Sequence, residues 1–372
     1  MRIFLAFPKR GSILIQDTEI WLKHVVPSLE KLGHQLVVFD RDFGTLNSGS
    51  LSSAAKQQER SAVTTDLYDA VVRANREKPL DLFFSYFHAD FIDHRVISDI
   101  RDLDIPTLNF SCNNVHQFFT VRDIAPLYDF CLVPEKAALE SFSEVGARDI
   151  HVQMGANPAL FKRFQVPKEY LVTFIGSKYA DRAVYIAELI RAGIDVRVWG
   201  PGWQDGSVRS LAGKGVSAFR DGGISRVWRG LKRRWKGRSH SQLVAQVAGP
   251  ILTDDEMIAT YNASSMALNF SKAIIEGTAQ QYVRHIRMRD FEIPMTGAAA
   301  FLEYSAELGE YYDLETEIVS FDSPEELAAK ATYYASHARE LQMIAEAGYK
   351  RATTDHTWES RFKVAFDKIG LS

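Results

Sequence analysis

Short apolar runs alternate with helical segments along the chain, and this alternation constrains the fold more than any other feature of the sequence. The first cycle is the run RIFLAF, then a segment over 17–34 with apolar residues spaced by three and four, then the run QLVVFD. Further runs are DLFFSYF, IPTLNFS, YDFCLVP and IHVQMG. These runs are mainly apolar and do not alternate between apolar and polar residues, which indicates strands of a parallel sheet that is covered on both faces by helices.

The alternation breaks near 158–168 and then begins again with YLVTFIGS, DVRVWGPGW, MALNFS and EIVSFD. We therefore predict an α/β protein with two Rossmann-like, doubly wound domains, one over 1–160 and one over 168–355. A terminal amphipathic helix over 356–372 is expected to cross back to the first domain. Ligands bind such sheets at the carboxyl ends of the strands, so we expect the two domains to face each other across a ligand-binding cleft.

Composition excludes several classes of protein. Of the 372 residues, 46% are hydrophobic and 24% are charged, as in globular proteins. Cys112 and Cys131 are too few for a disulfide framework, and the N-terminal run is too short for a signal peptide. We therefore expect a cytoplasmic location.

One basic segment stands out, since ten basic and two acidic residues lie between Asp205 and His240. Within it, 226–238 has apolar residues at spacings of three and four, which suits peripheral contact with an anionic membrane at the inner face. A disordered surface loop is an equal alternative. Nucleic acid is not an expected partner, because one basic segment without a recognised module is weak evidence for it.

The stretch RHIRMRDFEIPMTGAAAFLEY, 284–304, combines a basic cluster with one carboxylate. Pro294 is tolerated only in the first turn of a helix, so the helix is expected to begin near Asp290, with Arg287 and Arg289 at its positive end. Such a site suits a phosphate, and Glu292 suits the hydroxyl pair of a ribose. The alternative is an ordinary surface pair between Arg289 and Glu292.

The same stretch, with LNFSK, EIVSFDSPEELAAKATYY, AGYKRATTDHTWESRF and, in the first half, LYDFCLVPEKAALESFSEVGARDIHVQMGANPALF, resembles the CgeB-like (spore maturation) glycosyltransferases of the GT-B superfamily. The resemblance implies a nucleotide-sugar donor on the C-terminal domain and an acceptor on the N-terminal one. It implies donor binding by Gly176, Ser177, Lys178, Arg182, Trp199, Gly200, Asn269, Lys272, Arg287, Arg289 and Glu292. The first glutamate of the superfamily's Glu-x7-Glu pair is absent, because His285 or Arg284 stands there. The stereochemistry of transfer therefore stays undetermined.

An inverting transfer needs a general base near the acceptor hydroxyl. Polar residues follow two predicted strands of the first domain, and we take His88, Asp90 and His116 as catalytic candidates. Asn113 and Asn114 are candidates for acceptor binding. The alternative for His88, Asp90 and His116 is helix capping or lining of the cleft, and the alternative for the asparagine pair is a turn. No Asp-x-Asp pair lies in a setting that suits a metal, so we predict metal independence, no cofactor, and stabilisation of the leaving group by cationic side chains.

The sequence thus predicts a glycosyltransferase of hexosyltransferase type. Its donor would be a nucleotide-diphosphate sugar, with UDP as the expected nucleotide, and its acceptor a glycan, a lipid-linked sugar or a protein of the cell envelope. Two alternatives stay open: a nucleotide-sugar epimerase of the same fold, and a non-catalytic sugar- or nucleotide-binding scaffold. A Rossmann dehydrogenase is disfavoured, because the first strand runs into FPKRGS rather than a G-x-G-x-x-G loop.

Overall fold

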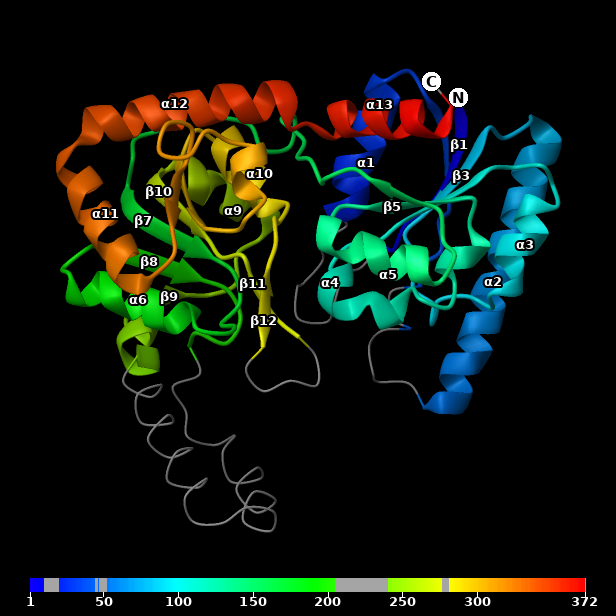
Figure 1. Ribbon diagram of the computed structural model, residues 1–372, viewed down its shortest axis with the longest axis horizontal. Helices are drawn as coiled ribbons and strands as arrows, with labels where there is room; N and C mark the ends of the chain where they lie inside the picture. Colours follow the sequence, from blue (N-terminus) through cyan, green and yellow to red (C-terminus); the bar gives the residue numbers. More distant parts are fainter. Residues whose placement is uncertain (10–19, 44–45, 47–51, 205–239, 276–280, 372) are drawn as a thin grey trace, which may run out of the picture. The chain divides into compact units, whose positions relative to one another are not determined.

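The computed structural model describes residues 1–9, 20–43, 46, 52–204, 240–275 and 281–371. The chain forms two compact units, each assembled from separate stretches of sequence (Figure 1). Unit 1 comprises Met1–Phe161, Ala273–Glu292 and Ala352–Ser372, and unit 2 comprises Lys162–Lys272 and Ile293–Arg351. The basic segment over 205–239, including the predicted membrane contact at 226–238, lies outside the described residues.

Unit 1 contains a six-stranded parallel sheet in the order β2-β1-β3-β4-β5-β6. Its strands are β1 (Arg2–Ala6), β2 (Gln35–Val38), β3 (Leu82–Ser85), β4 (Thr107–Phe110), β5 (Phe130–Val133) and β6 (Asp149–His151). The helices of this unit are α1 (Ile20–Lys31), α2 (Ser53–Glu77), α3 (Arg95–Arg101), α4 (Asn114–Gln117), α5 (Leu139–Glu144) and α13 (Trp358–Ile369).

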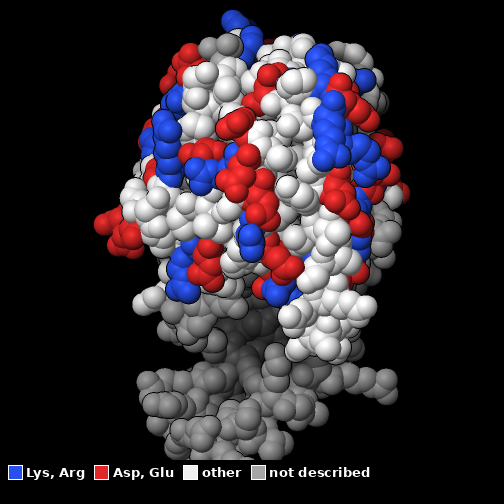
Figure 2. Space-filling view, turned by 90° about the vertical axis from the view of Figure 1, so that its right-hand side faces the viewer, with Lys and Arg blue, Asp and Glu red and all other residues white. Residues whose placement is uncertain are grey.

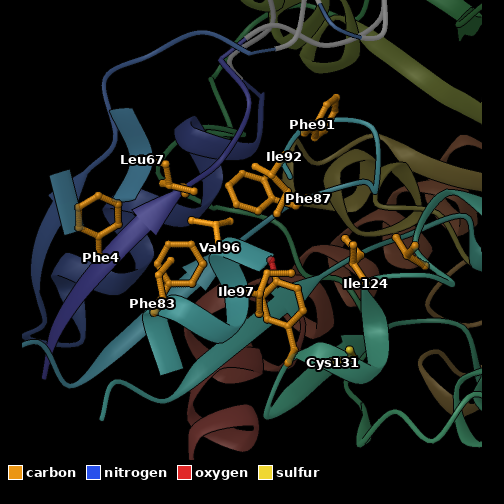
Figure 3. Packing of buried hydrophobic residues seen from close by; sticks show 14 of the residues in the cluster. Phe4, Leu67, Phe83, Phe87, Phe91, Ile92, Val96, Ile97, Ile124 and Cys131 are labelled. Carbon is orange, nitrogen blue, oxygen red and sulfur yellow. The ribbon is translucent and has the colours of Figure 1, made fainter. Parts of the chain in front are cut away.

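Both faces of this sheet are buried. Along β1, Phe4 belongs to a cluster that also contains residues of α2 and α3, while Ile3 and Leu5 belong to a cluster with α1 and α13. Figure 3 shows the first cluster, with Phe83 of β3, Leu67 of α2 and Val96 of α3 among its members. The uninterrupted apolar runs of the sequence follow from this burial on two sides.

Helix α13 brings the end of the chain back to unit 1. Trp358, Phe362 and Phe366 are buried in the same cluster as Val25 and Leu29 of α1. Just before α13, Thr357 bridges to Ala156, and a Cβ on Gly155 would lie 2.7 Å from the backbone carbon of Thr357. This close backbone approach requires glycine at 155.

Unit 2 contains a second six-stranded parallel sheet, in the order β14-β13-β10-β7-β8-β9. Its strands are β7 (Tyr170–Ile175), β8 (Val196–Trp199), β9 (Ala248–Gly249), β10 (Ser264–Asn269), β13 (Ala299–Glu303) and β14 (Val319–Phe321). Helices α6 (Arg182–Arg191) and α11 (Pro324–Ser336) pack together on a core that includes Phe174 and Phe301. Helix α9 (Asp254–Asn262) lies against β7 and β10, and a capping box between Thr253 and Glu256 fixes its start.

Three elements lie where the chain changes unit: β11 (Lys272–Ile274), α10 (Arg289–Met295) and α12 (Ala338–Asp355). A short strand, β12 (Tyr282–Arg284), pairs with β11. The predicted α/β class, with a parallel sheet in each half of the fold, is confirmed. Among the described residues, no helix combines the length and apolarity needed to cross a bilayer.

The surface of unit 1 over α2 and α3 carries charges of both signs (Figure 2). Figure 2, which views the right-hand side of Figure 1 where α2 and α3 lie, shows Lys and Arg interspersed with Asp and Glu. Two ion pairs link α2 to the loop that precedes α3, Lys56 with Asp90 at 2.7 Å and Arg60 with Asp93 at 3.0 Å. Exposed pairs of this kind contribute little to stability, so the buried clusters hold α2 in place.

A buried glutamate fixes the loop that follows β4. The backbone N–H of Asn113 donates to Glu135 at 2.5 Å, and the side-chain amide of Asn114 donates to it at 3.0 Å. Asn113 has φ of 67°, in the left-handed region that Asn tolerates. Burial raises the pKa of Glu135 to about 7, against smaller lowering effects of these hydrogen bonds.

We predict that Glu135 makes the stability of the protein fall as pH rises. The folded protein keeps this proton up to a pH of about 7, whereas a glutamate in the unfolded chain loses it near 4.5. The resulting loss between these pH values is on the order of 3 kcal/mol. Chemical unfolding of Glu135→Gln across this range should show a flatter pH profile than the wild type, while the exposed Glu140→Gln should follow the wild type. Parallel profiles for wild type and Glu135→Gln would contradict this account.

Candidate functional site

Two loops meet at the carboxyl edge of the sheet in unit 2. The loop after β7 carries Gly176, Ser177 and Lys178, and the loop after β8 begins at Gly200. The N–H of Gly176 donates to the carbonyl of Trp199 at 2.8 Å, and the N–H of Lys178 donates to the carbonyl of Pro201 at 2.9 Å. These hydrogen bonds extend the pairing of β7 with β8 into the loops. They hold the donor-binding candidates at 176–178 next to those at 199–200.

Gly200 makes this arrangement possible. Its φ is 133°, and a Cβ at this position would lie 2.3 Å from the carbonyl oxygen of Gly176. On the same loop, the indole Nε1 of the buried Trp203 donates to that oxygen at 2.6 Å. The side chain of Trp199 is used in packing: its ring lies 5.3 Å from that of Tyr170. The expected contact of Trp199 with a nucleotide base stays a prediction.

Arg182 stands at the start of α6 with its guanidinium group largely buried. The Nη1 atom donates to the carbonyl of Ser177 at 3.0 Å, and the group lies 5.4 Å from the ring centroid of Phe174 and 5.7 Å from that of Phe270. These cation–π contacts and the hydrogen bond fix the guanidinium directly behind the loop after β7.

Lys272 lies at the centre of a buried polar network just beyond β10 and Asn269. Its ammonium group donates to Asp181 at 2.6 Å and to the hydroxyl of Tyr185 at 3.0 Å, and it pairs with Glu303 at 3.0 Å. Burial alone would lower the pKa of Lys272, but the hydrogen bonds with these three residues raise it above its ordinary value. The lysine is therefore charged, and two carboxylates share that charge.

Glu303, the last residue of β13, also fixes the neighbouring loop. It accepts the backbone N–H of Ser271 at 2.9 Å and that of Lys272 at 3.1 Å. In unit 1, Glu135 likewise accepts the N–H groups of two successive residues, Asn113 and Asn114, from the loop after the adjacent strand. Each sheet thus has one strand-end carboxylate that binds the loop beside it.

Helix α10 begins at Arg289, one residue from the predicted start at Asp290, and spans 7 residues. Pro294 is its sixth residue and lies in the second turn, not in the first turn as predicted. Glu292 is buried and lies between two basic side chains within unit 1. One carboxylate oxygen is 2.9 Å from Nε2 of His24 in α1, and the other is 2.8 Å from Nη1 of Arg289. Burial raises the pKa of Glu292, but Arg289 and His24 outweigh this effect and bring it below its ordinary value, so Glu292 is ionised.

The surface-pair alternative for Arg289 and Glu292 does not describe this geometry, because the glutamate side chain is 1% exposed. The turn before α10 begins at Arg287, whose backbone N–H donates to the carboxylate of Asp290 at 2.8 Å. This bond stabilises the turn that leads into the helix.

The catalytic candidates after β3 lie in different surroundings. Burial lowers the pKa of His88 to about 4, against a smaller raising effect of Asp90, so His88 is neutral at neutral pH. Its ring stacks on that of Phe91 with centroids 5.1 Å apart. Asp90 is exposed and its carboxylate accepts a hydrogen bond from Lys56 at 2.7 Å.

The third catalytic candidate, His116, lies in α4 next to the asparagine pair. Asn114 is buried, and its side-chain amide bonds Ser111 and Glu135. The ring of His116 lies 5.8 Å from that of His285, which follows β12. The Asn113–His116 turn therefore adjoins the segment over 284–288.

The structure thus groups the candidates into two sets. Unit 2 holds the loops at 176–178 and 199–200 with Arg182, Asn269 and Lys272, and unit 1 holds the remaining candidates. Sequence reasoning missed Glu135, Glu303, His24 and His285. A glutamate at the end of a predicted strand was a usable signal for the first two, whereas no sequence pattern pairs His24 with Glu292.

Within the described part of the chain, no three His, Cys, Asp or Glu side chains are grouped in a way that could hold a metal ion. This observation concerns the protein side chains only. The metal independence of the reaction stays a prediction.

We predict that Gly200→Ala destabilises unit 2 by about 3 kcal/mol or more, because the methyl group meets a backbone carbonyl and φ is positive. Gly193→Ala is the matched control, since φ there is 76° but nothing lies within 4 Å of the added Cβ. Its cost is about 1 kcal/mol, from backbone conformation alone. Urea unfolding of both variants tests the difference, and equal losses would rule out the close approach at Gly200.

Comparison with solved structures identifies the fold. Sucrose-phosphate synthase from Thermosynechococcus elongatus matches with a TM-score of 0.60 and 12% identity, over 100% of both chains. Anabaena HepE, solved in complex with UDP-glucose, matches with a TM-score of 0.58 and 11% identity, over 99% of both chains. AviGT4, a glycosyltransferase of avilamycin A biosynthesis, matches with a TM-score of 0.54 and 12% identity, over 100% of this chain and 96% of its own. The predicted GT-B fold class is confirmed.

No curated protein matches the sequence. The family described as glycosyl transferase-like matches residues 182–367, which is half of the chain. The matched part contains Arg182, Lys272, Arg289 and Glu292. The chain therefore belongs to the glycosyl transferase-like family.

Proposed function

We propose that the protein is a CgeB-like hexosyltransferase that moves a sugar from a nucleotide-diphosphate sugar, with UDP as the nucleotide, to a glycan, lipid-linked or protein acceptor of the cell envelope. The family match over 182–367 carries this proposal. The fold shared with HepE, a protein solved with UDP-glucose, supports the choice of UDP. The protein would act in the cytoplasm, with membrane contact through the undescribed segment 226–238.

Glu292 is proposed to bind the ribose of the donor. An ionised carboxylate offers about four lone-pair positions. Its contacts with His24 and Arg289 use one oxygen each, which leaves positions for two hydroxyl groups. Because the side chain is 1% exposed, neighbouring side chains must move to admit the ribose. Arg289, already beside this carboxylate, would then approach the phosphates.

In the proposed reaction, the bond between the anomeric carbon and the phosphate oxygen breaks, and the nucleoside diphosphate leaves with the electron pair. The acceptor oxygen forms the new bond and gives up its proton. His88 is neutral at neutral pH, as a general base must be, but the pKa of about 4 makes it a weaker base than an exposed histidine. His116 and Asp90 are the other proposed bases. Cationic side chains would stabilise the leaving diphosphate.

We expect one nucleotide among UDP, GDP, dTDP, CDP and CMP to stabilise the wild type in a thermal-shift screen. At 100 times its Kd, a ligand adds about 2.7 kcal/mol of apparent stability. Arg289→Ala and Glu292→Gln should raise the Kd at least about tenfold, equivalent to 1.4 kcal/mol. The glutamine variant retains a hydrogen-bonding partner for His24. Arg95→Ala, an exposed arginine of α3 in the same unit, is the control.

A screen in which no nucleotide stabilises the wild type would refute the donor proposal and favour a scaffold that binds sugars only. Nucleotide binding combined with isomerisation of UDP-glucose in the absence of any acceptor would instead identify an epimerase.

We further propose that donor binding needs neither a metal ion nor a cofactor. The expected result is that EDTA leaves the Kd of the stabilising nucleotide unchanged, because arginine and lysine side chains compensate the phosphate charge. Isothermal titration with EDTA and then with added magnesium measures this directly. Binding that disappears in EDTA and returns with magnesium would contradict the proposal.

A further inference from the structure

His285 is buried with most of its hydrogen-bonding capacity unused. Its residue is 3% exposed, and within the described residues neither Nδ1 nor Nε2 makes a hydrogen bond that meets the usual distance and angle limits, while the backbone of Ile286 makes only a minor polar contact with the ring. Leaving a buried polar atom without a hydrogen bond destabilises the folded state, and such atoms are rare in folded proteins. A ring with two of them needs an explanation beyond packing.

The charge state of His285 restricts what its ring can bind. Burial, then Arg287 and His116, lower the pKa of His285 to about 3, against a smaller raising effect of the Ile286 backbone, so the ring is neutral at neutral pH. A neutral imidazole has one donor and one acceptor nitrogen. Hydroxyl groups both donate and accept, so they match this ring, whereas a phosphate would use only its donor nitrogen. The nearby Arg287 disfavours a cation.

The position of His116 adds a geometric requirement. The two ring centroids are 5.8 Å apart, and the ring planes are inclined by 47°. An oxygen about 2.8 Å from one nitrogen of each ring would lie roughly 4 Å from each centroid, so the two centroids would subtend about 95° at that oxygen. This angle suits the tetrahedral oxygen of a hydroxyl group.

We propose that His285 is a substrate-binding residue that, together with His116, binds one hydroxyl oxygen of a carbohydrate. The inference rests on the proposed glycosyl transfer and specifies where a sugar is recognised. The hydroxyl belongs either to the transferred sugar of the donor or to the acceptor sugar, and the experiment separates these two sources.

The test uses the full chain with carbon-13 at Cε1 of its histidines. The resonance of His285 is assigned as the one that is absent from the spectra of both the His285→Phe and the His285→Gln variant. UDP, UDP-glucose, UDP-N-acetylglucosamine and two methyl glycosides are then added separately. A shift with a UDP-sugar that UDP does not produce supports the proposal and assigns the donor sugar. A shift with a methyl glycoside supports it and assigns the acceptor sugar.

His285→Phe keeps an aromatic ring and removes both nitrogens. We expect it to raise the Kd of the effective sugar ligand about tenfold, to leave the Kd of UDP unchanged, and to keep or raise the Tm. A residue needed only for folding would lower the Tm and affect every ligand alike. His151→Gln is the control. In the wild type, Nε2 of His151 lies 3.2 Å from the carbonyl oxygen of Pro134.

A His285 resonance that no ligand shifts would overturn the proposal. So would a His285→Phe variant that loses as much affinity for UDP as for the sugar ligand. Failure of the proposed function has a different signature. In that case no nucleotide stabilises the wild type, while the methyl glycosides still report on His285.

Discussion

In each sheet, one candidate loop depends on the same type of interaction, a buried strand-end carboxylate that accepts two successive backbone N–H groups. Parallel strands end at the same edge, and the loops that leave this edge carry backbone amides without partners in the sheet. Glu135 binds the amides of Asn113 and Asn114, and Glu303 binds those of Ser271 and Lys272. The backbone of Asn113 and Asn114 in unit 1 and of Lys272 in unit 2 is therefore fixed by a buried carboxylate.

The two carboxylates differ in electrostatics. Glu303 has a charged partner, Lys272, whose pKa is raised. Glu135 is bound by neutral amide groups, and burial brings its pKa to about 7. Lys272 therefore keeps its charge over the physiological pH range, whereas Glu135 changes its charge within that range.

The fold was predictable from the sequence, because burial of each sheet on both faces leaves uninterrupted apolar runs such as FCLV and LFFS. The start of α10 lies one residue from the predicted position, but Pro294 lies in the second turn of the helix, so this proline does not by itself explain where the helix begins. The site was predictable only in part. His24 and Glu292 are separated by 268 positions, and their contact depends on how α1 packs near α10. The unsatisfied ring of His285 is likewise a property of tertiary packing.

The discontinuity of unit 1 has a consequence for biosynthesis. Residues 1–161 are synthesised before unit 2, whereas Trp358, Phe362 and Phe366 of α13 join the same core only after unit 2 has been made. Until then, this face of the first sheet is covered by α1 without α13. The nascent chain therefore exposes part of an apolar face while unit 2 is synthesised, and such a transiently exposed surface favours aggregation or chaperone binding.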